Sequence, residues 1–508
     1  MTGGAGGLGG STLGGAATGG AGGHGLAVES ASSLNAVVRC VLGAAGGGAS
    51  TAGAGSVGGA GGSGASAEGG ASGLAVAAST MTGSFGGSGL SRGADGYGLS
   101  LNTVSTNTIV GSYIQGSTGV YVSAAASTTL RGNVLVGTNT AGNGFGMTGA
   151  SEGLLLSLNT VRGGPTGAGV LIAGGSGGTL VLSTNTVLAG AEKGIYILNS
   201  AAGASIWLTS NTVNPTLSPT QNTMGLHLEG LLSGATVQNN GIYYRTPGTP
   251  LATAPLYVKD SPGMVIERNR MSNPGMLLGG DYRGLFFYNA DNATVRFNDM
   301  HSTGTGLGYY VLFEAGLNSN GITLHGNVFS SSVTVTGSSA TVKLAADSQA
   351  GFVSDYNDYF SSAAANTAQW GTARCTLPNW TGIACLSTLD ADSIAAHPQW
   401  ADPGAEDFHP RSQRGRYNPA TLAFDLLDSV TSPTIDAGDP TEAFASEPAP
   451  NGGRVNQGSY ANTAEASKSA PAAQIAAFEG VFASSVTVQF STDSADGYLV
   501  QATSTDFS

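Results

Sequence analysis

The segment Leu182-Ser183-Thr184-Asn185-Thr186-Val187 contains a short pattern that returns along the middle of this chain: an apolar residue, two polar residues, then Asn, any residue and an apolar residue. It reappears as Val104-Ser105-Thr106-Asn107-Thr108-Ile109, Ile266-Glu267-Arg268-Asn269-Arg270-Met271 and Leu324-His325-Gly326-Asn327-Val328-Phe329. The full series is Asn107, Asn133, Asn159, Asn185, Asn211, Asn240, Asn269, Asn298, Asn327 and Asn357. Successive spacings are 26, 26, 26, 26, 29, 29, 29, 29 and 30 residues. A period this regular predicts a solenoid.

The residues around each Asn indicate strands rather than helices. Apolar residues lie five and three before the Asn and two after it, as Leu180, Leu182 and Val187 do around Asn185. This is the period-two pattern of a strand, with a corner at the Asn. A second short strand precedes it, as in Gly194-Ile195-Tyr196-Ile197. Coils of short strands predict a parallel β-helix, and nine steps of about 4.8 Å give a cylinder of roughly 43 Å.

The repeated Asn has a physical role at the corner. Its amide offers two donor hydrogens and an acceptor oxygen, so stacked copies can bond each other and the corner backbone. A buried corner without such partners would leave peptide groups unpaired, at a cost of about 1–3 kcal/mol each. We therefore expect an Asn ladder through all ten positions.

These repeats resemble the right-handed parallel β-helix proteins of the pectate-lyase-like superfamily, over residues 100–360. The resemblance implies an all-β, single-stranded, right-handed parallel β-helix. It says little about function, because this scaffold carries lyases, hydrolases, adhesins and structural proteins.

Composition excludes several classes of protein. The net charge is −13 and charged residues make up only 10% of the chain, which argues against a nucleic-acid partner. No apolar run is long enough to span a membrane. The first residues lack the charged and apolar parts of a secretory signal, so we expect that residue 1 is not the natural beginning of the folded unit.

The three cysteines have different roles. Cys375 and Cys385 bracket nine residues and predict a disulfide-closed loop in an extracellular protein, with two unpaired thiols as the alternative. Residues 34–42 align with residues 101–109, which places Cys40 at the position of Asn107 in an earlier coil. That position predicts a structural role for Cys40.

Four segments are expected along the chain. Residues 1–100 are Gly/Ala/Ser-rich degenerate coils with a flexible insertion over residues 43–73. Residues 101–360 are the regular β-helix. Residues 361–468 resemble the tail that precedes the anchor in secreted bacterial β-helix proteins, and they form an irregular cap on the open end. Residues 469–508 resemble the start of a fibronectin-type-III-like sandwich, with strands at 486–490 and 496–502.

The outer rows two residues before and one residue after each Asn change along the chain. Early coils carry mostly hydroxyl residues in these rows, whereas ionisable residues gather between residues 259 and 299 and in the rows that follow. We expect a glycan-binding patch there. Its candidate residues are Gln238, Lys259, Glu267, Arg296, Asp299, His325 and Asp355.

A structural interpretation of the same residues stays open. Glu267 and Arg296 lie one coil apart in one row, and Arg270 and Asp299 in another. Opposite charges at this spacing predict inter-coil ion pairs, each worth under about 1 kcal/mol if exposed.

The resemblance also raises a lyase alternative, in which an Arg or Lys abstracts a proton beside a uronate carboxylate. Its candidate catalytic residues are Arg268, Arg270, Arg296 and His301. Lyases of this kind often use Ca²⁺ on clustered acids, and no tight acid cluster accompanies these residues, so no metal is assigned. The signatures of polygalacturonases are absent. Hydroxyls outside the ladder, at Thr106 and Thr108, suggest an ice-binding solenoid as a minor alternative, although Gly132 and Val134 interrupt the array.

The sequence thus predicts an extracellular or cell-surface, monomeric β-helix with a structural, adhesive or glycan-binding role. Its expected partner is a polysaccharide or cell-surface glycan. No cofactor is expected. A polysaccharide lyase is the alternative.

Overall fold

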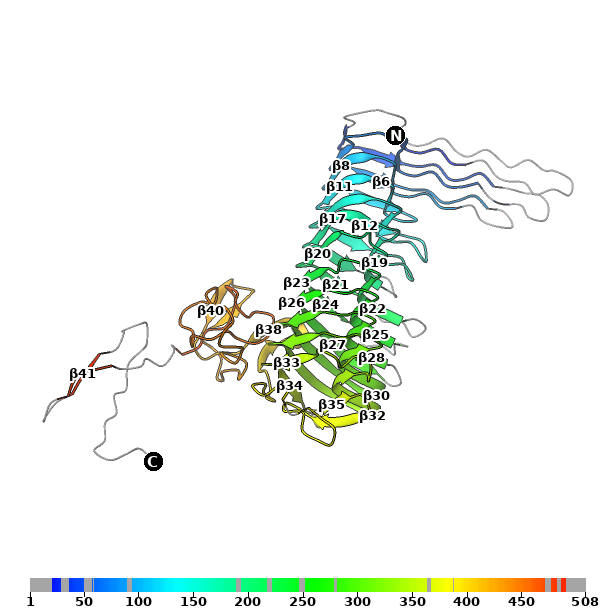
Figure 1. Cartoon of the computed structure of the whole chain (residues 1–508). Coiled ribbons are helices and arrows are strands. Elements are labelled where there is room, and N and C mark those ends of the chain that lie inside the picture. The colour runs from blue at the N-terminus through cyan, green and yellow to red at the C-terminus, as the bar shows by residue number, and fades with distance from the viewer. Residues whose placement is uncertain are drawn as a thin grey trace.

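The computed structural model describes residues 21–28, 36–49, 57, 59–88, 94–188, 193–216, 222–245, 252–277, 281–362, 367–386, 388–470, 477–481 and 486–489. These residues form a parallel β-helix that begins with coils near the N-terminus and ends near residue 394, with further segments beside its lower half (Figure 1). The all-β parallel solenoid predicted from the Asn period is confirmed. Among the described residues, no helix combines the length and apolar character needed to cross a bilayer.

Each coil contributes one strand to each of three rows, and every strand pairs in parallel with its equivalent one coil away. The first row precedes the corner. Its twelve strands among the described residues are β2 (Ala36–Val38), β5 (Ala75–Ala77), β8 (Ser105–Val110), β11 (Ala126–Arg131), β14 (Glu152–Ser157), β17 (Gly177–Ser183), β20 (Ser205–Thr209), β23 (Thr236–Gln238), β26 (Val265–Glu267), β29 (Thr294–Arg296), β31 (Thr323–His325) and β33 (Val353–Asp355).

The second row follows the corner. Its strands are β3 (Val41–Gly43), β6 (Thr80–Thr82), β9 (Tyr113–Gly116), β12 (Val134–Gly137), β15 (Thr160–Arg162), β18 (Thr186–Leu188), β21 (Thr212–Asn214), β24 (Gly241–Tyr243), β27 (Arg270–Leu277), the first halves of β30 (Asp299–Gly316) and β32 (Val328–Leu344), and β34 (Asp358–Ser361).

The third row completes the coil. Its strands are β1 (Leu26–Val28), β4 (Ala65–Ala67), β7 (Leu99–Asn102), β10 (Val120–Ser123), β13 (Phe145–Thr148), β16 (Val170–Ile172), β19 (Lys193–Leu198), β22 (Asn222–Glu229), β25 (Ala252–Lys259), β28 (Asp281–Tyr288), the second halves of β30 and β32, and β35 (Thr367–Trp370).

One apolar core fills the tube. Leu180 and Leu182 of β17 and Val187 of β18 all point inward and are fully buried, as the period-two pattern predicts. The same positions one coil later hold Ile206, Leu208 and Val213, which stack on them. Because each inward residue rests on its equivalent in the next coil, the core is continuous along the axis.

The corner between the first and second rows contains the Asn ladder. The side-chain oxygen of Asn211 accepts from the backbone N–H of Asn185 at 3.0 Å and from its side-chain amide at 2.9 Å. The amide of Asn185 also donates to the carbonyl of Leu156, at 2.8 Å. The residue just before the ladder position takes the left-handed conformation, with φ of 54° at Thr184 and 55° at Ser210. The ladder hydrogen bonds stabilise this conformation, which L-residues otherwise avoid.

The predicted member Asn107 lies outside the ladder. It belongs to strand β8, where its side chain is buried and donates to the hydroxyl of Thr128. The ladder position of that coil is Ser112, whose backbone N–H donates to Asn133 at 2.9 Å. The 26-residue spacing from Asn107 to Asn133 is therefore a coincidence, because the coil that links the two corners is only 21 residues long.

The ladder extends beyond its asparagines at both ends. The backbone N–H of Cys40 donates to the hydroxyl of Ser79, and that of Ser79 donates to Ser112, both at 3.1 Å. Cys40 therefore does stand at a corner, although its alignment with Asn107 is wrong. At the other end, Asn357 donates from its backbone to the hydroxyl of Ser393, at 2.8 Å.

Part of the predicted flexible insertion, residues 43–73, is ordered. Of these residues, 43–49 and 59–73 include strand β4 and form backbone hydrogen bonds with other Gly-rich segments, such as Gly47 to Phe85 and Gly61 to Ala94. We call residues 43–49, 59–64, 82–88 and 94–98 the glycine arm, which lies at the N-terminal end of the β-helix (Figure 1). A Cβ atom on Gly47 or Gly61 would collide with a backbone carbonyl of the neighbouring segment. Residues 50–56 and 58 lie outside the described part.

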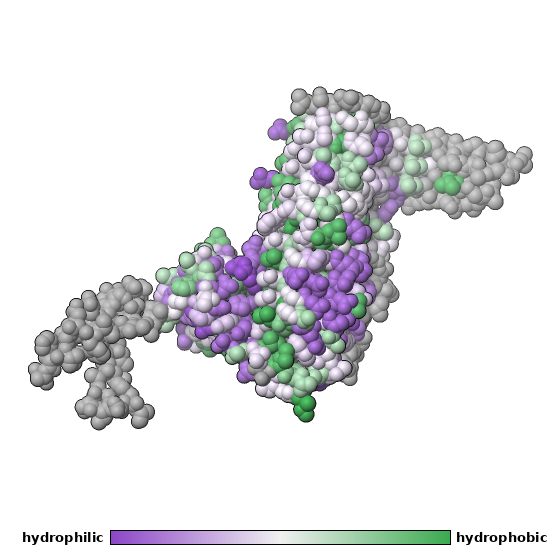
Figure 2. All heavy atoms as spheres, in the orientation of Figure 1, coloured by the Kyte–Doolittle hydropathy of each residue, from purple (hydrophilic) through white to green (hydrophobic). Residues whose placement is uncertain are grey.

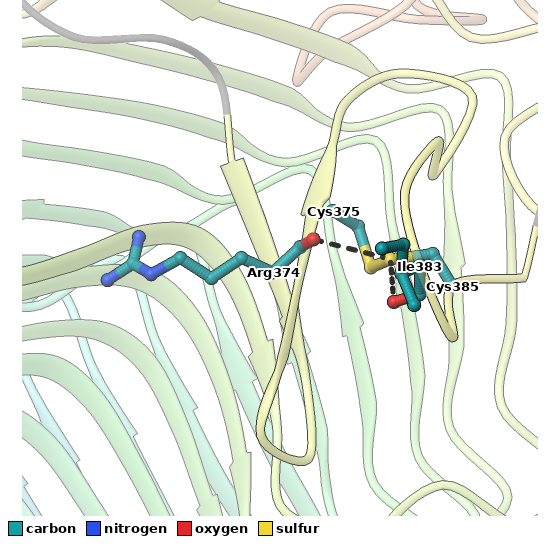
Figure 3. The surroundings of a disulfide bond; sticks show 4 residues. All are labelled: Arg374, Cys375, Ile383 and Cys385. Atoms are coloured by element: carbon teal, nitrogen blue, oxygen red, sulfur yellow. Dashed lines mark hydrogen bonds between the residues drawn. A yellow bond between two sulfur atoms is a disulfide. The ribbon is translucent and has the colours of Figure 1, made fainter.

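The far end of the tube is closed by residues 373–394. Strand β36 (Ala373–Thr376) forms an antiparallel hairpin with β35, and Cys375 and Cys385 are joined by a disulfide (Figure 3). Trp380 is fully buried in this loop, and its ring N–H donates to Asp390 at 2.6 Å. Asp390 also accepts from the side chains of Ser354, Asn357 and Ser393, so the last coil has its corner groups paired.

Residues 397–469, here named the C-terminal segment, pack beside the lower coils (Figure 1), so that of the cap predicted over residues 361–468 only the part before this segment covers the end of the tube. They include β37 (Trp400–Asp402), the 3-10 helix η1 (Pro403–Ala405), β38 (Asp407–Pro410), β39 (Arg416–Asn418) and β40 (Ala423–Asp425). Further on, β41 (Ala477–Val481) pairs antiparallel with β42 (Val486–Gln489). The predicted strand at 486–490 thus has a different partner from the one expected, and residues 496–502 lie outside the described part.

The ladder predicts a large effect from a small substitution. Asn185→Ala should lower the free energy of unfolding by about 3 kcal/mol or more, because it removes the acceptor of two buried Asn159 donors and the donor to Leu156. Chemical denaturation followed by circular dichroism would measure this. Thr186→Ala, on an exposed side chain of the same coil, is the control and should change the value by less than about 0.5 kcal/mol. Equal values for the two variants would show that the ladder does not stabilise the coil.

Candidate functional site

Most of the predicted glycan-binding residues lie on the corner that the C-terminal segment covers. Glu267 accepts from the guanidinium of Arg296 at 2.7 Å, so the predicted inter-coil ion pair is present. Arg296 also lies 3.7 Å from the carboxylate of Glu442, and His325 lies 3.5 Å from that of Asp439. These side chains are therefore engaged with each other and with the C-terminal segment.

The two arginines before and after Asn269 are part of the same contact. The guanidinium of Arg268 donates to the carbonyl of Ala461 at 3.0 Å, and the guanidinium of Arg270 lies 5.3 Å from the centre of the Tyr460 ring. Asp299 stands in register with Arg270 one coil away, and its carboxylate accepts from the backbone N–H of Ser459 at 2.9 Å. Two of the arginines predicted to be catalytic in a lyase, Arg268 and Arg270, thus contact the C-terminal segment.

The remaining predicted residues are packed against or bonded to other groups, or lie away from this corner. His301 is half-buried and packs edge-on against Trp400, with ring centres 5.7 Å apart, and burial followed by the charge of His397 lowers its pKa to about 4. Asp355 accepts from the backbone N–H groups of Tyr356 and Asp392. Gln238 stands in register with Glu267. Lys259 alone lies on another face, at the end of β25.

That other face carries a stack of aromatic side chains on the outer side of the third row. Tyr196, His227, Tyr257 and Phe286 occupy equivalent positions in four successive coils. Their ring centres are 4.3, 4.8 and 5.0 Å apart in turn. Stacked rings at these distances stabilise adjacent coils by about 0.5–1.5 kcal/mol per pair beyond their burial.

Cations close both ends of this stack. The ammonium of Lys193 lies 4.3 Å from the centre of the Tyr196 ring. At the other end the guanidinium of Arg283 lies 5.2 Å from the Phe286 ring and 4.6 Å from that of Tyr309, against which the ammonium of Lys343 also packs. The ring faces are therefore occupied by other rings or by cations, and ring edges and hydroxyls face outward.

Two acids hold the neighbouring bases in place. Glu229 accepts from Lys259 at 2.6 Å and from the hydroxyl of Tyr196 at 3.1 Å. Glu314 accepts from Arg283 at 3.0 Å and lies 3.0 Å from the ammonium of Lys343. We call this surface the aromatic strip. It comprises Lys193, Tyr196, His227, Glu229, Tyr257, Lys259, Asp260, Asp281, Arg283, Phe286, Tyr309, Glu314 and Lys343.

The strip is polar but balanced in charge. Lys193, Lys259, Arg283 and Lys343 give four positive charges, and Glu229, Asp260, Asp281 and Glu314 give four negative ones. Burial, followed by the charge of Lys193, lowers the pKa of His227 to about 4, so the imidazole is neutral at neutral pH. Figure 2 shows hydrophilic residues gathered beside the lower half of the tube, whereas the upper coils are mostly pale or hydrophobic.

Glu229 is suited to binding more than to proton transfer. Although burial raises the pKa of Glu229, the hydrogen bonds from Lys259 and Tyr196 outweigh it and the net pKa is lowered. A general acid in a glycosidase needs a raised pKa and a second carboxylate facing it across the sugar. An ion-paired carboxylate instead offers a fixed acceptor.

The sequence carried a signal for this strip that the Asn register does not show. Tyr196, His227, Tyr257 and Phe286 recur at spacings of 31, 30 and 29 residues, close to the coil length. Rows counted only two before and one after each Asn miss them, because the strip lies in the third row, half a coil away.

Comparison with protein-family models gives a match to part of the chain. A family model described as "Periplasmic copper-binding protein (NosD)" matches residues 87–246, which are 160 of the 508 residues. A search of curated proteins finds no match. Within the described part of the chain, no three side chains of His, Cys, Asp or Glu come together as a metal site would require.

The buried Asp299 predicts a pH dependence of stability. Burial raises its pKa to about 7, well above 3.8, so the folded state binds a proton more tightly than the unfolded state. Its contribution is favourable below pH 4 and is lost as pH rises through about 7. We therefore expect the melting temperature of D299N, minus that of the wild type, to increase between pH 4 and pH 8, as thermal melts would show.

The control for this series is Thr186→Ala, which changes no titratable group. The difference between its melting temperature and that of the wild type should not vary with pH. If D299N behaves in the same way, the pKa of Asp299 is not raised in the folded protein relative to the unfolded chain.

Proposed function

We propose that this protein is a non-catalytic β-helix outside the cytoplasm that binds a neutral, hydroxyl-rich polysaccharide along the aromatic strip. The observation that carries the proposal is the strip itself. It aligns fixed donors and acceptors on the outer side of successive coils, from Lys193 in β19 to Lys343 in β32. Coils about 4.8 Å apart repeat these groups along the axis, so one extended chain of sugars can contact several coils at once.

The charge balance favours a neutral ligand. Three of the four strip bases lie near a strip acid: Lys259 near Glu229 and Asp260, Arg283 near Asp281 and Glu314, and Lys343 near Glu314. A polyanion would gain little from a surface without net positive charge, and the chain as a whole carries −13. Paired charges still hydrogen-bond hydroxyl groups, because each keeps unused donor or acceptor positions.

Two observations support a location outside the cytoplasm. The Cys375–Cys385 disulfide suits an oxidising compartment. The family whose model matches residues 87–246 is described as periplasmic. Attachment to the cell surface stays a prediction.

Copper binding, named in the same description, does not fit the residues of this chain. His227 is the single histidine of the matched stretch, which contains no cysteine. Its ring lies between Tyr196 and Tyr257, and the charges of Lys193 and Lys259 that lower its pKa would also repel a copper ion. We therefore carry over no copper site.

The positions of the arginines that a lyase would use as bases disfavour this alternative. Arg268 and Arg270, its expected bases, are engaged by Ala461 and Tyr460 of the C-terminal segment. A uronate would have to displace that segment to reach them.

The proposal predicts binding that depends on the strip. Affinity electrophoresis of the full chain in gels containing neutral glucans, mannans or xylans should show retardation by at least one polymer. Tyr257→Ala, and the double variant Glu229→Gln/Lys259→Met, should each weaken binding by about tenfold or more, because each removes contacts worth about 1.4 kcal/mol. The double variant removes both partners of the Glu229–Lys259 ion pair, and Asp260, which also lies 3.7 Å from Lys259, still accepts from the side-chain amide of Asn289.

Controls separate binding from stability and from catalysis. Arg131→Ala, on an exposed side chain of β11, should bind as the wild type does. Incubation with polygalacturonate, followed by the ultraviolet absorbance of the unsaturated product, tests the lyase alternative. Retardation by polyuronates alone, or turnover that is lost in R268A, would overturn the proposal.

A further inference from the structure

One exposed tryptophan stands apart from the strip. Trp207 lies in the middle of β20 in the first row and is 42% exposed, whereas Trp380 and Trp400 are buried. Its neighbours in register are the smaller Val181 and Thr236. Its ring N–H donates to the hydroxyl of Ser205 at 2.9 Å, which fixes the orientation of the indole. An exposed indole that is held by a hydrogen bond and flanked by smaller side chains is an unusual feature of a protein surface.

The indole differs from the rings of the aromatic strip. Among the described residues, no other aromatic ring or cation packs on the face of Trp207, whereas Tyr196, His227, Tyr257 and Phe286 cover one another. A ring that stabilises the solenoid by stacking has its faces hidden. A ring whose face is open can stack on a ligand instead.

A hollow of 210 Å³ lies beside this indole. The residues that line it include Gly234 and Gly263, in two stacked turns. A Cβ on Gly234 would lie 2.5 Å from the carbonyl of Gly263. Ser233 and Thr236 supply hydroxyls to its wall. The volume is smaller than the roughly 300–1,000 Å³ of drug-sized pockets, which restricts the occupant to about one small ring.

The hollow and the strip lie on strands that follow one another along the chain. Residues 199–204 connect β19, which carries Tyr196, to β20, which carries Trp207. In the next coil, residues 230–235 connect Glu229 to Thr236 in the same way. The strip and the hollow therefore lie on consecutive strands of the same coils, joined by one short connection.

We infer that the hollow beside Trp207 is a stacking subsite for a single pyranose ring of a neutral glycan. This inference rests on the proposed function and adds a second point of attachment. The C–H face of the sugar packs on the indole, and its hydroxyls bond the hydroxyls and the backbone of the turns. A sugar, with one apolar face and a polar rim, matches both parts of the hollow.

The test uses the polymer that retards the wild-type chain and an oligosaccharide prepared from it. Trp207→Ala should weaken binding by about tenfold or more, and Trp207→Phe should retain part of it, because a smaller ring still offers a face. Tyr257→Ala, in the aromatic strip, serves as the reference variant. Oligosaccharide addition should shift the tryptophan fluorescence of the wild type, and W207F should lose that shift.

The outcomes separate the two claims. Binding that is weakened by Y257A but unchanged in W207A overturns the subsite and leaves the proposed function intact. Absence of binding by the wild-type chain overturns both. A change of oligomeric state in W207A, measured by size-exclusion chromatography with light scattering, together with unchanged glycan affinity, would assign Trp207 to a protein contact and overturn the subsite. Equal melting temperatures of wild type and W207A establish that any lost binding is local.

Discussion

The structure depends on pairing the backbone at the buried corner between the first and second rows. The chain turns sharply there, with one residue in the left-handed conformation, and the peptide groups at the turn point into the protein, away from water. One side chain per coil pairs these groups. Its oxygen accepts from the ladder residue of the preceding coil, and its amide donates to a backbone carbonyl of that preceding coil. The remaining coil geometry follows, because a shared corner forces the strands of successive coils into register.

That register has a functional consequence. Once coils are in register, residues about thirty apart in sequence become neighbours, and a side chain repeated once per coil becomes a continuous line on the surface. In the upper coils these lines hold many Ser, Thr and Gly residues, together with the stacked pair Tyr97 and Tyr121. In the lower coils they hold aromatic rings and ions, and one such line forms the aromatic strip while another supports the C-terminal segment.

The fold could be predicted from the sequence because its determining residue recurs with a nearly constant period. The period also produced one error: a buried Asn within β8 stands 26 residues before Asn133, whereas the corner of that coil holds Ser112. The charged rows were identified, but their burial was not, since contacts of Arg268 with Ala461 or Asp299 with Ser459 join residues more than 150 apart. No local pattern reports such a contact. Trp207 was missed although it stands between the buried Ile206 and Leu208, where the period-two pattern points a side chain outward.

The glycine arm has a consequence for how this region tolerates change. Its composition suggests that any small residue would serve, but the hydrogen-bonded segments approach so closely that a methyl group on Gly47, Gly61 or Gly96 would strike a carbonyl oxygen of the adjacent segment. Interleaved with these are positions such as Gly46, where a Cβ meets only ordinary contacts. Mutational tolerance should therefore differ sharply between adjacent glycines, and a stretch that looks interchangeable by composition holds strict positional information.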